Sequence, residues 1–249
     1  MRIEKWYYSN LNARPEKIHA QELVAAIQGF PPDVLERYPA AIENKDLPDS
    51  MDELCEMIQA DGFVEWRADA LKDVPYLQNR RNVASNWTKL RMLRHVIESN
   101  QGAVLTTDNA YPIVPFSVID QTLSSCPADL KALYLHWVAE PYEVAFQQRH
   151  YDALAGLTPV GIDGVLGNFT GVGWIAYFTP DGASAFLETW RTMPNVDGQS
   201  VCAEARRNQP LTGFYACNPH LALSLFDMER IQGNSGVISE GNPLIIKDK

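Results

Sequence analysis

Residues 83–109 read VASNWTKLRMLRHVIESNQGAVLTTDN, and their pattern is the clearest indication of the fold class. Its first part carries one apolar stripe at helical spacing, which predicts a helix over Val83–Ser99 and is formed by Leu90, Leu93, Val96 and Ile97. Asn100–Gly102 is typical of a helix C-terminus, and Ala103–Thr106 follows at once as a short apolar strand. A helix therefore leads into a buried strand, and Asp108 comes just after the carboxyl end of that strand.

The same alternation extends in both directions along the chain. Strands are predicted over Ile3–Ser9, Gly62–Trp66, Leu133–Val138 and Trp174–Phe178, and helices over Pro15–Phe30, Met51–Gln59, Phe116–Ser124 and Asp181–Trp190. Residues 31–50, which are acidic and rich in proline, and the glycine-rich run Gly161–Gly173 are expected to be irregular. Strands that alternate with helices predict an α/β fold with a mainly parallel central sheet flanked by helices. The length fits a single domain spanning residues 1–249.

Composition and charge limit the partners. The net charge of −10 argues against binding of a nucleic-acid polymer, which needs a basic face. No stretch approaches the roughly 18 apolar residues of a membrane span, and the first residues lack the apolar core of a secretory signal. The cysteines are widely scattered, at Cys55, Cys126, Cys202 and Cys217. That pattern is typical of reduced thiols, so we expect a cytoplasmic protein.

The predicted sheet points to one place for a ligand. In parallel α/β sheets, ligands bind beyond the carboxyl ends of the strands. Two polar segments follow predicted strands there, Asn10–Arg14 and Thr107–Asn109. Asn and Arg side chains can bind a base, a ribose or a phosphate, and the Asp108 carboxylate is a ligand that hard cations prefer. Each segment, taken alone, is equally typical of a polar turn.

Several common site motifs are absent from the sequence. The chain has no His-x-x-x-His pair, no Gly-x-Ser-x-Gly elbow, no phosphate-binding Gly-Lys-Ser/Thr loop and no Gly-x-Gly-x-x-Gly turn. The histidines are dispersed; His95 is expected to pack on its helix, and His220, which follows Asn218-Pro219, is either structural or a ligand. The basic stretch Gln78–Asn82, expected to be a loop before the clear helix, is either solvated or a partner for phosphate charge.

The order of these features resembles the lipooligosaccharide and collagen galactosyltransferases of glycosyltransferase family 25, which adopt the GT-A fold. The matching segments span nearly the whole chain: Asn10-Leu11 with Arg14 and Lys17, Ala84–Leu90 entering the helix, Thr106–Ala110 ending the strand, Tyr177–Ala183, Met193–Asp197, Asn218-Pro219 and Asn234–Ile238. The chain departs from the family at Asn86, where the family has His, and at Thr107 and Asn109, where the family has acidic residues that hold a metal. Its metal motif is therefore degenerate.

The resemblance implies a transferase that moves a sugar from a nucleoside-diphosphate sugar, such as a UDP-sugar, to a hydroxyl of a glycan or related acceptor. The implied substrate-binding residues are Asn10, Leu11, Arg14, Ser85, Asn86, Lys89 and Thr107. Asp197 would be the catalytic base on the acceptor side if the enzyme inverts. Asp108, also assigned to catalysis, would face the diphosphate with Asn109.

The implied metal is manganese or magnesium, held by Asp108, Asn109 and His220. We expect it to bind together with the nucleotide, because a single carboxylate leans on substrate phosphates for the remaining ligands. Without a metal, Lys89 or the Arg80-Arg81 pair would meet the charge of the leaving diphosphate. The alternative from another class is a catalytically idle relative that binds a sugar or a protein on the same scaffold, which the missing acids at Thr107 and Asn109 favour.

Overall fold

The computed structural model describes most of the central sheet and four helices. The described residues are 3–9, 29–30, 33–38, 46–60, 76–107, 110–138, 158–159, 165–167, 172–191, 212–217 and 221–224. The predicted helix over Pro15–Phe30 and the predicted strand over Gly62–Trp66 fall largely or wholly outside these residues.

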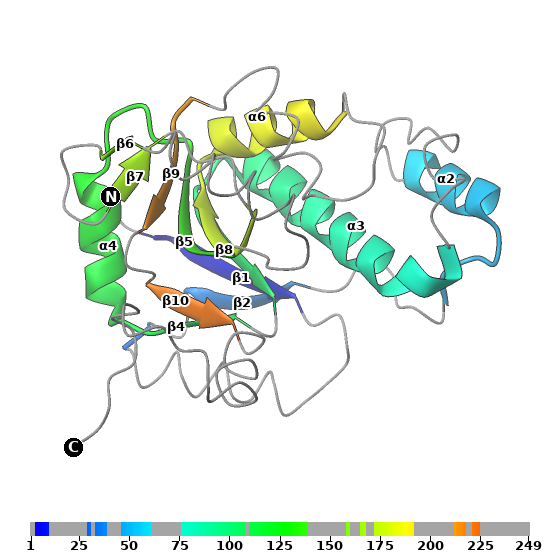
Figure 1. The fold of residues 1–249 in the computed structure, drawn as a ribbon, viewed down its shortest axis with the longest axis horizontal. Helices are drawn as coiled ribbons and strands as arrows, with labels where there is room; N and C mark the ends of the chain where they lie inside the picture. The colour runs from blue at the N-terminus through cyan, green and yellow to red at the C-terminus, as the bar shows by residue number, and fades with distance from the viewer. Residues whose placement is uncertain are drawn as a thin grey trace, which may run out of the picture.

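An eight-stranded sheet forms the centre of the described structure (Figure 1). Its spatial order is β2 (Leu35–Tyr38), β1 (Lys5–Ser9), β3 (Ala103–Thr107), β8 (Val172–Phe178), β5 (Ala132–Val138), β9 (Phe214–Cys217), β7 (Val165–Gly167) and β6 (Thr158–Pro159). The pairings set β8 and β7 antiparallel to their neighbours, while the other six strands run in one direction. The predicted α/β fold with a mainly parallel sheet is confirmed.

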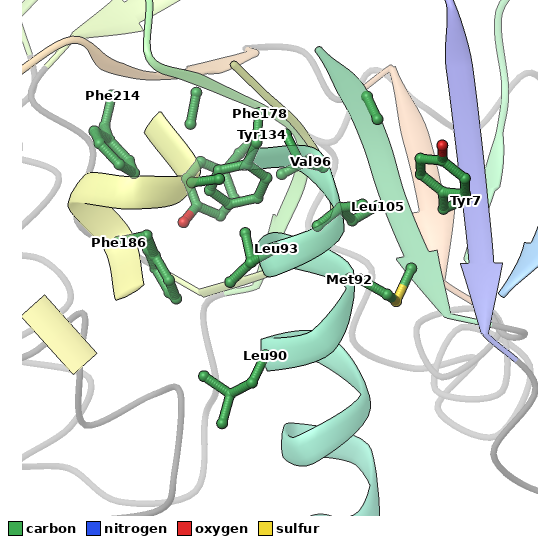
Figure 2. Close-up of a cluster of buried hydrophobic side chains, with 14 of the residues drawn as sticks. Tyr7, Leu90, Met92, Leu93, Val96, Leu105, Tyr134, Phe178, Phe186 and Phe214 are labelled. Carbon is green, nitrogen blue, oxygen red and sulfur yellow. The ribbon is translucent and has the colours of Figure 1, made fainter. Parts of the chain in front are cut away.

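Helices cover both faces of this sheet. On one face, α3 (Tyr76–Ser99) and α6 (Pro180–Arg191) pack over a cluster of buried side chains that includes Leu93 and Phe214 (Figure 2). On the other face, α4 (Phe116–Ser125) contributes Ile119 to a second cluster. Successive residues of β5 alternate between the two clusters, as the pleat of a strand requires. The described helices also include α2 (Met51–Ala60), and none of these four is long and apolar enough to cross a membrane.

Helix α3 confirms the helix that was predicted from the most periodic part of the sequence, but it begins earlier than predicted. Leu90, Leu93 and Val96 are buried, as the apolar stripe predicts (Figure 2). The helix ends where predicted, because Asn100 adopts a left-handed conformation with φ of 52° and its amide bonds the Ile97 carbonyl at 3.1 Å. The prediction that Gln78–Asn82 is a loop was wrong, since the helix begins at Tyr76, just after Pro75. Pro is common at the first turn of a helix, where its missing N–H costs nothing.

Most other predicted elements are present. Strands β1, β3, β5 and β8 and helices α2, α4 and α6 match their predicted ranges to within two residues. The expected cap of α2 is confirmed, because the Glu53 amide donates to Ser50 Oγ at 3.2 Å. Ile3, which was predicted to start the first strand, lies just before β1. Its amide donates to Asp120 Oδ1 of α4 at 2.8 Å.

Two segments predicted to be irregular contain strands. Residues 31–50 include β2, which pairs in parallel with β1 as the edge of the sheet. Prolines at 32 and 39 flank this four-residue strand, and edge strands tolerate proline because one side of their backbone is unpaired. The run Gly161–Gly173 includes β7, which pairs with β9, and its end belongs to β8. Both strands depend on partners distant in the chain, so local composition gave no sign of them.

Helix α6 docks directly on the chain that leads into β5. Thr179 caps the helix, because its Oγ1 accepts the Gly182 amide at 3.0 Å, and Pro180 occupies the first helical position. The Thr179 amide and hydroxyl both donate to the Lys131 carbonyl, at 2.9 and 3.1 Å. The Lys131 amide in turn bonds the Gly213 carbonyl at 2.8 Å. This network holds α6, β5 and β9 together at the edge opposite the carboxyl ends of the parallel strands.

Candidate functional site

Strands β1 and β3 end together at one edge of the sheet. They are adjacent and parallel, and their register pairs Ser9, the last residue of β1, with Thr107, the last residue of β3. The two polar segments singled out in the sequence, Asn10–Arg14 and Thr107–Asn109, therefore start from neighbouring positions. Their own residues, Asn10, Leu11, Arg14, Asp108 and Asn109, lie outside the described residues.

Other strands open onto the same edge. Strand β2 ends there at Tyr38, which is paired with Ser9, and β5 ends there at Val138. Strand β9 ends in the same direction at Cys217, immediately before residues 218–220. Ligand sites in α/β sheets lie beyond the carboxyl ends of parallel strands. This edge is consequently the candidate functional site, and we call it the carboxyl edge.

A small second sheet joins two of the segments at the carboxyl edge. Strand β4 (Ala110–Pro112) starts directly after residues 108–109, and β10 (Ala222–Ser224) starts shortly after residues 218–220. The two strands pair antiparallel, with Ala110 opposite Ser224 (Figure 1). The Leu221 amide also donates to the Leu135 carbonyl of β5 at 2.8 Å. The segments after β3 and after β9 are thereby connected through one short ladder that is tied to the main sheet.

Thr106 is hydrogen-bonded to Ala110, on the other side of residues 107–109. Among the described residues it is one of three buried polar residues, with Thr88 and His136, and 3% of its surface is exposed. Its Oγ1 donates to the Ala110 carbonyl at 3.4 Å, across residues 107–109. That distance is at the long end of hydrogen bonding, so the bond is weak, but it is shielded from water.

His136 is a second buried polar residue near the carboxyl edge. Its imidazole is 2% exposed, within the central strand β5. The register between β5 and β8 shifts on both sides of His136, so that strand pairing is irregular there. Among the described residues, its Nδ1 is the buried side-chain nitrogen or oxygen atom that has no hydrogen-bond partner, although the residue has other contacts. The sequence analysis gave His136 no role; a histidine within an otherwise apolar strand was the available signal.

An aromatic cluster stabilises the packing of β1 and β2 against α3. Tyr7 is hydrogen-bonded through its hydroxyl to His95 Nε2 at 3.0 Å, and the rings of Tyr7, Tyr38 and His95 pack together. Burial raises the pKa of Tyr7, and the nearby Glu36 charge adds to that effect. The expected packing role of His95 is therefore seen in the structure. Lys5 of β1 forms an ion pair with Glu36 of β2 at 3.1 Å, and both side chains are partly exposed.

The remaining predicted site residues are placed to different degrees. Ser85, Asn86 and Lys89 belong to α3, and Lys89 is half-buried with contacts of its own. The prediction that Ala84–Leu90 enters a helix was wrong, because these residues lie well inside α3. Asp197 lies outside the described residues, and the structure does not test its role.

The predicted metal ligands stay a prediction. Within the ranges that the structure describes, no group of three or more His, Cys, Asp or Glu side chains could hold a metal ion. Asp108, Asn109 and His220, the residues assigned to manganese or magnesium, are outside those ranges. What the structure provides is the anchoring of their segments, at Thr107 and Ala110 on one side and at Cys217 and Leu221 on the other.

No protein-family model matches the sequence. No curated protein matches it either. Among solved structures, the chain is similar to the apo form of mouse xyloside xylosyltransferase 1, with a TM-score of 0.42 and 9% sequence identity over 85% of this chain and 84% of that chain. Similarity at this level assigns neither a family nor a function.

Proposed function

We propose that this protein transfers a sugar from a nucleoside-diphosphate sugar to a hydroxyl group of a glycan or related acceptor. The observation that carries the proposal is the register between β1 and β3, which pairs Ser9 with Thr107. Segments 10–14 and 108–109 leave the sheet from these two positions, so one ligand at the carboxyl edge can contact both. The proposal further takes the described fold as one GT-A-like domain.

The donor would lie across the two segments. Asn10 and Arg14 offer an amide and a guanidinium, which suit the base, ribose or phosphates of a nucleotide. Leu11 would pack against the base or ribose. Thr107 and Asp108 would face the diphosphate, where negative charge increases as the sugar leaves. On the acceptor side, Asp197 would take the proton of the attacking hydroxyl.

The charge of the leaving diphosphate needs a positive partner. Asp108 and Asn109, with His220, would hold manganese or magnesium only when nucleotide phosphates supply further oxygen ligands. Lys89, Arg80 and Arg81 are the candidate partners in the absence of a metal. All three belong to α3, which packs over the sheet and runs toward β3.

Binding measurements test the donor part of the proposal. Calorimetry with uridine and guanosine diphosphate sugars, with and without manganese, should detect binding at millimolar ligand or below. Manganese titration followed by electron paramagnetic resonance should detect the metal only when nucleotide is present. No binding of either nucleotide would contradict the proposal, whereas binding without turnover of any acceptor would favour the idle binding protein.

Substitutions at the strand end test the assignment of Asp108. Asp108→Ala should abolish turnover, and Asn109→Asp should tighten manganese binding because a second carboxylate is added. Asp181→Ala is the matched control, since Asp181 is exposed in the first turn of α6 at the opposite edge of the sheet. Tight manganese binding without nucleotide would contradict the prediction that the degenerate motif binds metal only weakly. Full activity in the presence of a chelator would mean that Lys89, Arg80 or Arg81, not a metal, neutralises the leaving diphosphate.

A further inference from the structure

We draw no further inference here: the strongest candidate, the buried imidazole of His136 at the irregular pairing of β5 with β8, belongs to the site already described, and nothing in the described part of the chain shows a ligand that it would bind.

Discussion

Gly182 is the position at which the structure most clearly opposes a simple sequence rule. It lies in the first turn of α6, where replacing glycine by alanine ordinarily stabilises a helix by up to about 1 kcal/mol. A methyl group at Gly182, however, would lie 1.9 Å from the backbone oxygen of Lys131 and 2.5 Å from its carbonyl carbon. Backbone atoms cannot swing aside as a flexible side chain can. We therefore expect Gly182→Ala to destabilise the protein.

The magnitude follows from what must move. Alanine Cβ atoms essentially never approach another heavy atom closer than 3.0 Å, so α6 must shift from Lys131 by more than 1 Å. Such a shift breaks both bonds from Thr179 to the Lys131 carbonyl, which contribute about 1 kcal/mol each. Residual overpacking adds about 1–3 kcal/mol. After the helix gain is subtracted, unfolding should be easier by about 2–4 kcal/mol, which lowers Tm by about 5–15 °C in a chain of this size.

Thermal and urea unfolding followed by circular dichroism measure this effect directly. Ser184→Ala is the matched control, because Ser184 is exposed in the same helix and alanine there also gains helix propensity, although less than at a glycine. It should leave Tm unchanged or raise it slightly. A Tm for Gly182→Ala equal to or above that of the wild type would refute the proposed close packing of α6 on Lys131.

Two further predictions concern other parts of the fold. Asn100→Ala should lower the free energy of unfolding by about 1 kcal/mol, because alanine is strained at positive φ, whereas Asn100→Gly should not; equal urea midpoints for the two variants would contradict this. Burial, followed by the hydrogen bond to Asp129, raises the pKa of Tyr215 to about 12. The unfolded chain loses that proton first, near pH 10, so stability should fall as the pH rises from about 10 to 12. In Tyr215→Phe, the free energy of unfolding measured by urea titration should decrease less over that pH range. An unchanged pH dependence would show that other groups cause the decrease.

Elements that depend on local pattern were predictable from the sequence. The C-terminal half of α3, β3, α4 and α6 each carry an apolar period or a cap within a few residues of their own chain. Strand direction was not predictable in the same way. Alternation of strands and helices favours parallel pairing, but β8 enters the sheet antiparallel between β3 and β5. Direction depends on which strands pair, and pairing is a property of the whole fold.

The candidate site was likewise predictable only in part. Its location follows from the rule that ligands bind beyond the carboxyl ends of parallel strands. The register of Ser9 with Thr107 shows that the two strands before the polar segments end at neighbouring positions. The residues behind it, Thr106 and His136, were missed. Their surroundings include strands β4, β8 and β10, which come close to them only in the folded chain. A polar residue in an apolar strand was a visible signal, but the sequence does not say what it contacts.

The pairing of β4 with β10 connects segments that are more than a hundred residues apart in the chain. One follows β3 and contains Asp108; the other follows β9 and contains His220. Because β4 and β10 pair with each other, the positions at which the two segments rejoin the described fold are coupled. The ladder is tied to β5 through the bond from Leu221 to the Leu135 carbonyl, so this coupling extends into the core beside His136. Ala110 and Leu221, at which the two segments rejoin the described fold, are therefore held by one connected set of backbone hydrogen bonds.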